Sequence, residues 1–231
     1  MLRKTLSKKV SEINQISRKQ AETIIKEKNI IVNGVLETRP FIKVIDTDII
    51  ELDKDFQKKI NILIFNKPKG CITSKKDEKN RSIVYDYLPK KFHHFHYIGR
   101  LDYNSEGLLI MTDNTSFKRY MESPKSKVKR VYLVNVVGTF NEIKLKSMNK
   151  KIYSDISYER PKVKLVHSNK NKHTLRFELL EGKNREIRNI CEIFNLNVEK
   201  LKRISFGKFS IKAIPYSKYK EMKIISENNK R

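Results

Sequence analysis

The sequence predicts an α+β protein in which a small N-terminal unit precedes a larger domain with a mainly antiparallel sheet. Two observations predict this class. Short apolar runs typical of strands outnumber amphipathic segments, and the two kinds do not alternate regularly as βαβ units would. The predicted strands lie near 62–65, 108–112, 131–137, 163–166, 174–180 and 203–211, and the predicted helices near 115–122, 141–148 and 184–194.

The N-terminal unit is predicted to begin with a helix inside residues 11–36. Ser17 and Gln20 have the spacing of a capping box, which satisfies free backbone N–H groups at a helix start. The apolar face of this helix comprises Ala21, Ile24 and Ile25. A strand at 30–32 then runs into Asn33-Gly34, a dipeptide typical of hairpin turns. Apolar residues around the turn 46–48 are expected to continue the sheet: Val44, Ile45, Ile49 and Ile50.

Charge indicates the kind of partner. The chain carries 51 Lys and Arg against 26 Asp and Glu, a formal net charge of +25, which predicts a highly anionic partner. Residues 61–231 hold +21 of this charge and residues 1–60 only +4. Lys, Asn and Ile are all abundant, as expected from AT-rich codon usage, so we attribute part of the lysine excess to composition rather than to a partner. The 13 arginines are more informative, because a guanidinium group matches phosphate geometry and stacks on bases.

Several classes of protein are disfavoured. No apolar run approaches the roughly 18 residues that span a bilayer, and the basic start is not followed by a signal-peptide apolar stretch. Cys71 and Cys191 are too few for a disulfide framework or a zinc module. We therefore expect a soluble, cytoplasmic protein with no membrane partner. No long amphipathic seam predicts obligate assembly, which favours a monomer.

Two polar segments precede the most informative motif. Lys67 and Lys69 lie in the turn NKPKG, 66–70, where cations beside a glycine can approach phosphate, although basic loops are also ordinary surface. Histidines cluster at 93–96, but no nearby Cys or acidic residue completes a metal ligand set, so we expect a structural role and no metal.

The loop between Gly99 and Gly107 carries the strongest signal for chemistry. If this loop is extended, Arg100 and Asp102 share one face because they lie two residues apart. Loops of this composition are also common surface turns, in which Asp102 would only cap a turn. The whole string, GRLDYNSEGLLIMTDN, decides between these interpretations.

That string resembles the motif GRLDxxSxGLLxxTxD of pseudouridine synthases of the RsuA/RluB/RluE/RluF type, and differs only at its last position, Asn114. Three further segments resemble the same family. They are NKPKG, RVYLV at 130–134 with Arg130 where lysine is frequent, and EGKNREIR at 181–188 with Glu186 in place of glutamine. Residues 1–55 resemble an S4 RNA-binding domain. The resemblance implies a linker at 56–61, a catalytic domain at 62–225 and a basic tail at 226–231.

The resemblance implies isomerisation of uridine to pseudouridine. This reaction breaks the N1–C1′ bond, turns the uracil and joins C5 to C1′, so no cofactor and no metal are expected. Asp102 is implied as the nucleophile, a role that suits a carboxylate. Because the target base must leave its stack, Arg100 is implied to fill the vacated position and Tyr132 to pack against the uracil.

An ionised Asp102 in a partly desolvated pocket needs a cation nearby. On a helix through 184–194, Ile187, Ile190, Cys191 and Phe194 form the buried stripe. Arg188 lies at the edge of this stripe, about 100° from Ile187, and is expected to reach Asp102. Arg185 lies near the opposite face and is expected to contact phosphate. The remaining predicted RNA contacts are Asn184, Arg130, Lys67, Lys69, Arg18 and Lys19, the last two in the first turn of the N-terminal helix.

Members of the resembled family with an S4 domain act on ribosomal RNA. The SEGLL string, the short linker and the GKNREIR segment favour the large-subunit enzymes, with 23S rRNA or a ribosomal precursor particle as partner; 16S rRNA is the alternative. A non-catalytic RNA-binding or ribosome-assembly protein is the alternative from another class, and intact Asp102, Tyr132 and Arg188 argue against it. A glycosidase is disfavoured because no second acid is identifiable.

Overall fold

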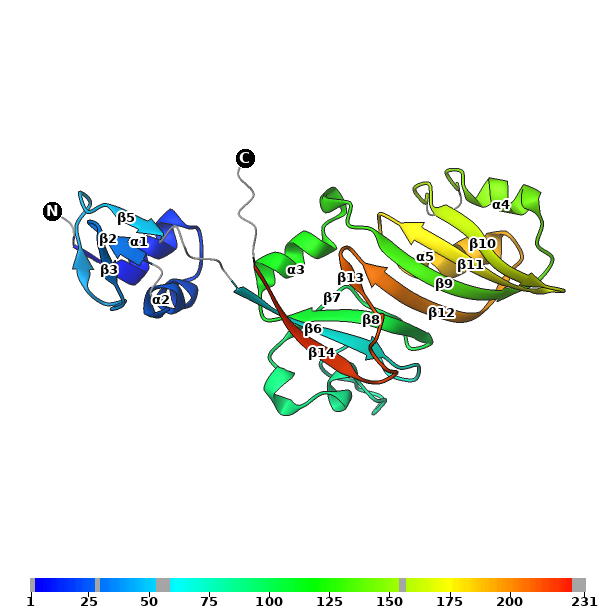
Figure 1. Ribbon diagram of the computed structural model, residues 1–231, viewed down its shortest axis with the longest axis horizontal. Coiled ribbons are helices and arrows are strands. Elements are labelled where there is room, and N and C mark those ends of the chain that lie inside the picture. Colours follow the sequence, from blue (N-terminus) through cyan, green and yellow to red (C-terminus); the bar gives the residue numbers. More distant parts are fainter. Residues whose placement is uncertain (1–2, 28–29, 53–58, 154–156, 226–231) are drawn as a thin grey trace. The chain divides into compact units, whose positions relative to one another are not determined.

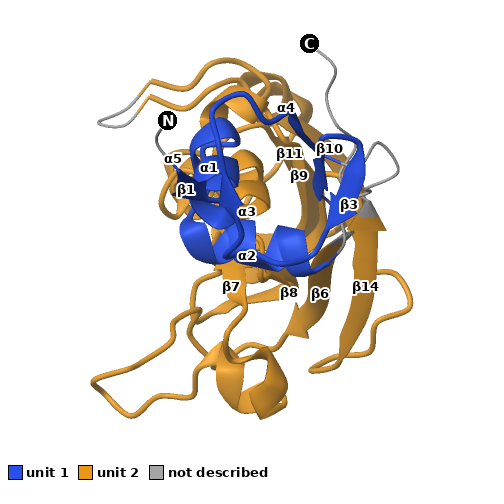
Figure 2. Cartoon of the chain, turned by 90° about the vertical axis from the view of Figure 1, so that its left-hand side faces the viewer, with its two compact units in different colours: residues 1–58, 226–231 blue, residues 59–225 orange. Residues whose placement is uncertain are grey.

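The computed structural model describes residues 3–27, 30–52, 59–153 and 157–225 (Figure 1). The chain divides into two compact units, residues 1–58 with 226–231 and residues 59–225 (Figure 2). The predicted linker at 56–61 lies partly outside the described residues, and its last three residues begin a strand. The predicted tail at 226–231 lies wholly outside them.

The first unit packs two helices against short strands. Its elements are β1 (Lys4–Thr5), α1 (Leu6–Ile13), α2 (Arg18–Lys26), β2 (Ile30–Val32), β3 (Val35–Glu37), β4 (Lys43–Val44) and β5 (Ile50–Leu52). The predicted capping box begins α2, where the Ser17 side chain accepts from the Gln20 N–H and Gln20 bonds back to the Ser17 N–H. The predicted turn at Asn33-Gly34 joins β2 to β3, and both residues have positive φ.

The small sheet of this unit differs from the expectation. Strands β3, β2 and β5 form one sheet, whereas β4 pairs with β1 in a separate two-stranded sheet. Of the residues expected to continue the first sheet, only Ile50 does so, and Val44 is buried in the core of the unit instead. A local apolar pattern predicts a strand but not its pairing partner, which depends on segments distant in sequence.

In the described residues, the second unit is built on one sheet of nine strands. Seven of them follow one another in the order β10-β11-β9-β12-β8-β6-β14, and the other two, β7 and β13, pair with β8 and β12. The strands are β6 (Lys59–Lys67), β7 (His96–Ile98), β8 (Ser105–Thr112), β9 (Arg130–Val137), β10 (Lys162–Asn169), β11 (Lys172–Leu179), β12 (Asn197–Phe206), β13 (Phe209–Ser210) and β14 (Tyr219–Ile225). All of these pairings are antiparallel except β8 with β12. The predicted α+β class with a mainly antiparallel sheet is therefore confirmed for this unit.

Strands β6 and β8 are buried on both faces. Ile64 and Ile110 face a core shared with α3 (Thr115–Glu122), whereas Phe65 and Leu109 face a core shared with the 3₁₀ turns Val84–Tyr87 and Lys90–Phe92. This double burial explains why the sequence reads as continuous apolar runs at these strands rather than as alternation. It also holds the ends of β6 and β8, where the predicted motif loops begin, in fixed register.

The other half of the sheet is covered by α4 (Glu142–Met148) and α5 (Glu186–Ile193), which pack with β9 and β11 around a third core. The parallel pairing of β8 with β12 joins the two halves. It requires Gly107, because a Cβ at this position would lie 2.4 Å from the Arg203 carbonyl oxygen. The motif glycine thus has a packing reason as well as a positive φ of 106°.

Two predicted elements differ from the structure. The strand expected at 203–211 begins earlier, at Asn197, and breaks at Gly207, so that β12 and β13 form a hairpin. The helix expected at 184–194 is shorter, because Arg185 has a φ of +51° and ends the helical conformation on the N-terminal side. The apolar periodicity predicts which residues of these two elements are buried, but it does not predict where the backbone reverses at Gly207 and Arg185.

Candidate active site

The loop between β7 and β8 is fixed through its backbone carbonyl groups. Thr73 Oγ1 donates to the Leu101 carbonyl at 2.8 Å and accepts from the Leu101 N–H at 3.2 Å. The Gly70 N–H donates to the Tyr103 carbonyl at 3.0 Å, and Arg188 Nη2 donates to the Asn104 carbonyl at 3.0 Å. Because the carbonyls of Leu101, Tyr103 and Asn104 are all bonded, this part of the loop has few alternative conformations, and its side chains project in set directions.

Lys67 lies at the centre of this arrangement. Its ammonium group, fully buried, donates to the carbonyls of Pro68, Asp102 and Ser105 at 3.0, 3.2 and 2.9 Å. Burial lowers the pKa of Lys67, while Cys71 and Asp102 act in the opposite direction. This burial contradicts the predicted RNA contact of Lys67, because its ammonium group is out of reach of solvent and directs its hydrogen bonds at the 66–70 turn and at the start of β8 and its preceding loop.

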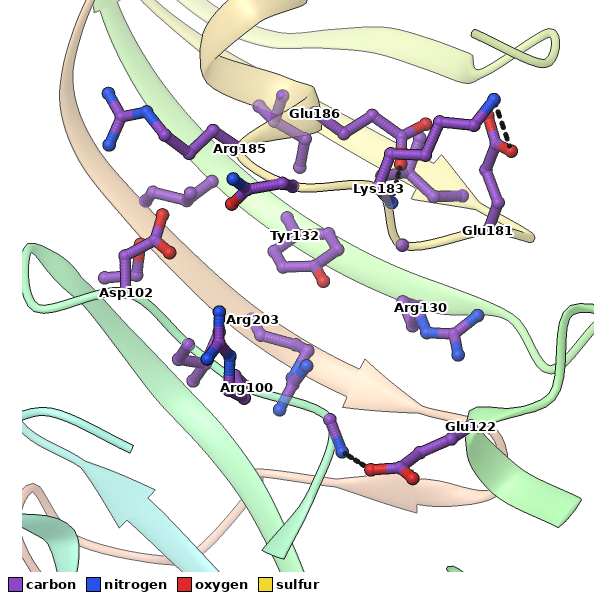
Figure 3. A pocket seen from close by; sticks show the side chains of 18 of the residues that line it. Arg100, Asp102, Glu122, Arg130, Tyr132, Glu181, Lys183, Arg185, Glu186 and Arg203 are labelled. Atoms are coloured by element: carbon purple, nitrogen blue, oxygen red, sulfur yellow. Dashed lines mark hydrogen bonds and ion pairs between the residues drawn. The ribbon is translucent and has the colours of Figure 1, made fainter. Parts of the chain in front are cut away.

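The Asp102 side chain is free although its backbone is held. Among the described residues its carboxylate accepts no hydrogen bond and forms no ion pair, and the side chain is half-buried. It lines a cleft of about 470 Å³. In Figure 3, Asp102 lies on one side of this cleft, below Arg185, with Tyr132 toward the middle and Arg130 on the far side.

Cations line the cleft without carboxylate partners. Arg100, Arg130, Arg185 and Arg203 all border it, and none forms an ion pair with a carboxylate of the described part of the chain. Arg203 is 2% exposed, donates from Nε to the Leu108 carbonyl at 2.7 Å, and leaves Nη2 without an acceptor among those residues. Unpaired cations in a desolvated site favour a polyanionic ligand.

Tyr132 and Arg130 stand on β9 two residues apart and therefore point to the same side of the sheet. Tyr132 is buried, with 9% exposure, and borders the cleft. Arg130 donates to the carbonyls of Val128, Leu180 and Met121 and lies over the Phe206 ring. The guanidinium of Arg130 joins three backbone segments at the border of the cleft, and burial lowers its pKa; the predicted RNA contact of Arg130 stays a prediction.

Residues 181–187 form the opposite wall. Asn184 and Arg185 are exposed and border the cleft, as the predicted base and phosphate contacts require. Arg188 is half-buried, and burial lowers its pKa, as does Arg185, whereas Asp102 raises it. We expected Arg188 to reach the Asp102 carboxylate. It reaches the same loop, but its hydrogen bond goes to the Asn104 carbonyl.

The remaining predicted contacts are Lys69, in the second unit, and Arg18 and Lys19, in the first. Lys69 is exposed, does not line the cleft, and its backbone N–H donates to the Tyr216 hydroxyl at 2.9 Å. Arg18 and Lys19 are exposed in the first turn of α2, in the first unit.

Sequence reasoning missed several residues of the site. Thr73 and Glu122 hold the motif loop, the latter by accepting from the Gly99 N–H at 2.8 Å. The sequence assigns no role to Arg203, and Glu186 differs from the glutamine of the family motif without an assigned role. Thr73 and Glu122 carry no local signal, because their partners lie more than twenty residues away.

No group of three or more His, Cys, Asp and Glu side chains is placed to hold a metal ion in the part of the chain described. Within the same residues, no helix is both long enough and apolar enough to cross a bilayer.

A free carboxylate serves no purpose in a surface that only attracts phosphate, since it would repel the ligand. The fold and the cleft together therefore indicate an enzyme that acts on nucleic acid. A sequence model of the RNA pseudouridylate synthase family matches residues 61–192. A solved structure of a pseudouridylate synthase has the same fold, with a TM-score of 0.65, 21% identity and 96% coverage of both chains.

Curated relatives extend over nearly the whole chain. An uncharacterised RNA pseudouridine synthase of Rickettsia bellii is 38% identical over 94% of this chain and 96% of its own length. Ribosomal large subunit pseudouridine synthase B of Bacillus subtilis is 30% identical over 90% of this chain and 88% of its own. The chain belongs to the pseudouridine synthase family, of the RsuA/RluB type. It is an isomerase that acts on uridine in RNA.

Proposed function

We propose that this protein isomerises a specific uridine of ribosomal RNA, with 23S rRNA or a large-subunit precursor particle as substrate, and that it acts in the cytoplasm as a monomer. The similarity to the large-subunit enzyme of Bacillus subtilis and the SEGLL form of the motif support the large subunit. The net charge of +25 supports a large polyanionic substrate.

Asp102 is the proposed nucleophile. The single observation that carries this role is a carboxylate without partners among the described residues, in a cleft lined by cations, on a loop in which the carbonyls of residues 101–104 are held by hydrogen bonds. A carboxylate bound to a cation or to N–H groups would be a weaker nucleophile, so the freedom of this side chain suits covalent attack.

Other cleft residues take roles in handling the flipped base. Arg100, exposed at the cleft, fills the position that the target uridine vacates, and the buried ring of Tyr132 packs against the uracil. Arg185 contacts a phosphate and Asn184 positions backbone or base. Arg188 holds the Asp102 loop through Asn104 and adds positive potential at the nucleophile.

The first unit is proposed to be an S4 RNA-binding domain. Its capped helix, hairpin and exposed Arg18 and Lys19 support this assignment. Replacing both cations with glutamine is expected to lower the slope of log RNA affinity against log salt by up to about two, the effect of losing two phosphate contacts. The rate constant for isomerisation of bound RNA should be unchanged. An unchanged salt dependence would contradict the assignment of these two residues.

The most direct test is chemical mapping of pseudouridine in total rRNA and tRNA from cells with the gene, without it, and with D102N. We expect one pseudouridine of the large-subunit rRNA to disappear without the gene and to remain absent with D102N. Loss of a 16S site would instead assign the small subunit. No lost site in either strain would favour a ribosome-assembly protein without catalysis.

A further inference from the structure

Two exposed tyrosines and an exposed lysine meet at the turn 66–70, outside the cleft. Tyr103 is 43% exposed, Tyr216 is 54% exposed, and Lys69 is exposed in the turn itself. Strand β6 lies between β8 and β14 and runs antiparallel to both, so it ends where they begin (Figure 1). The turn after β6 therefore meets the loop that carries Tyr103 and the loop that carries Tyr216.

Backbone hydrogen bonds of the turn fix both tyrosines. The Gly70 N–H donates to the Tyr103 carbonyl at 3.0 Å, and the Tyr103 hydroxyl oxygen lies 4.0 Å from the place that a Cβ of residue 70 would take. The Lys69 N–H donates to the Tyr216 hydroxyl at 2.9 Å. Because consecutive Cα atoms are about 3.8 Å apart, the two tyrosines approach neighbouring points of one turn.

The two rings and the lysine are free to meet a ligand. Among the described residues, neither Tyr103 nor Tyr216 packs against another aromatic ring or under a cation. Lys69 forms no ion pair with a carboxylate of that part of the chain. Exposed aromatic rings beside an unpaired cation are the combination that binds single-stranded nucleic acid, because bases stack on the rings and the cation attracts the backbone.

This surface adjoins the proposed nucleophile. Asp102 lines the cleft, whereas Tyr103, the next residue, does not. A uridine that reaches Asp102 leaves its stack, and its neighbours in the strand lose a stacking partner. The distance of about 3.8 Å between adjacent Cα atoms is close to the rise of about 3.4 Å between successive bases of a strand. The neighbouring nucleotide can therefore reach Tyr103 while the target occupies the cleft.

We propose that Tyr103, Tyr216 and Lys69 form a stacking platform for an unpaired nucleotide of the substrate RNA next to the target uridine. The base stacks on Tyr103, Tyr216 extends the aromatic surface, and Lys69 contacts a phosphate. Stacking reads no base edge, so the platform selects a single-stranded neighbourhood rather than a sequence. Its place beside the target rests on the proposed role of Asp102, whereas its affinity for single-stranded RNA does not.

The test measures the affinity of the full chain for a single-stranded oligouridine of about 12 nucleotides and for an RNA duplex of about the same length. Y103A and Y103L should bind oligouridine about tenfold more weakly, because neither residue offers an aromatic face, and Y103F should stay within about twofold of wild type. The duplex should bind wild type and Y103A within about twofold, since its bases are already stacked.

Y153A is the matched control for the loss of an exposed tyrosine. Tyr153 is 76% exposed, has the Lys151 ammonium 5.5 Å from its ring centroid and does not line the cleft. Its replacement should leave both affinities unchanged. K69Q should lower the slope of log affinity against log salt by about one, whereas Y103A should leave this slope unchanged.

Carbon-13 NMR of the full chain with ring-labelled tyrosine supplies a readout that needs no activity. Y103F, Y216F and Y153F identify the three resonances by their absence. Addition of oligouridine should move the Tyr103 and Tyr216 resonances upfield, because a stacked base shields the ring beneath it. The Tyr153 resonance should not move, and the duplex should move none of the three.

Several results would overturn the platform. They are wild-type oligouridine affinity in folded Y103A and Y103L, an equal loss of affinity for the duplex, or resonances of Tyr103 that do not move. On rRNA, Y103A should raise KM about tenfold and change kcat less than about threefold. An unchanged KM in a variant that has lost oligouridine affinity would refute the placement beside the target. The expected binding and resonance shifts, in a wild-type protein that isomerises no uridine of rRNA, would support the platform and refute the proposed function.

Discussion

The two walls of the cleft are held by different kinds of interaction. The Asp102 loop is fixed by donors bound to backbone carbonyls, with Lys67 and Arg188 as the charged donors and Thr73 and Gly70 as neutral ones. The wall at 181–186 is fixed by carboxyl groups, above all Glu181 and Glu186. One wall therefore depends on groups that keep their protons near neutrality, and the other on a group that loses its proton there.

This difference follows from what each wall does. A nucleophile must keep one position and one charge, and carbonyl bonds achieve the first without touching its carboxylate. The opposite wall carries the exposed Asn184 and Arg185, which meet a ligand that enters and leaves. Titratable contacts hold such a segment less firmly. Each prediction below is a way to break one wall while the other stays intact.

D102N should have the largest effect. Replacing the nucleophile leaves the loop backbone unchanged and should lower kcat by at least about 10³-fold, with RNA affinity within about twofold of wild type. Single-turnover assays and filter binding measure the two quantities. D113N is the control, because Asp113 is exposed and, among the described residues, accepts a hydrogen bond from the Asn61 side chain alone. Turnover of D102N near the wild-type rate would remove Asp102 from the mechanism.

K67M should break the wall that carries Asp102. Three carbonyls lose their buried donor, which should lower the free energy of unfolding by about 3 kcal/mol. Denaturant melts measure this, and kcat should fall because the loop is no longer fixed. K69M changes an exposed lysine in the same turn and should stay within about 0.5 kcal/mol of wild type. Equal stability of the two variants would refute the assigned role of Lys67.

The stability of E186Q should diverge from wild type with pH. The pKa of Glu186 is raised to about 7 from 4.5, so its contribution is complete below pH 4.5 and is lost as pH rises through about 7. Wild-type Tm should therefore drop relative to E186Q by about 5 °C between pH 5 and 8. In E178Q, where the pKa of the native carboxyl is lowered, the Tm difference should stay constant over this range, and calorimetry distinguishes the cases.

R185Q should have the smallest effect, and it tests whether the opposite wall contacts RNA directly. Removing one phosphate contact should lower the slope of log affinity against log salt by about one and weaken binding several-fold, with kcat little changed. K146Q, which removes an exposed cation of α4 paired with Glu142, should leave the slope unchanged. A slope that falls equally in both variants would mean that Arg185 contributes only to the overall positive potential of the protein and makes no direct phosphate contact.

Local patterns predicted much of the first unit and of the central strands. Local interactions were predictable at the capping box of Ser17 and Gln20 and at the turn Asn33-Gly34, because each depends on a few residues that are adjacent in sequence. The apolar runs of β6 and β8 reflect burial on both faces. The pairing of Val44 and the backbone reversal at Arg185 were not predictable in this way, because each depends on partners placed by the whole fold.

The sequence by itself determined the family, the aspartate of the motif and the polyanionic partner, because these depend on residue identity and spacing. Only the tertiary structure decided what the cations do. Lys67 and Arg130 look like phosphate ligands in the sequence, yet folding removes both from solvent and directs them at carbonyl oxygens. Burial decides whether a cation can contact a ligand or bonds to the protein itself, and burial depends on how the whole sheet is assembled.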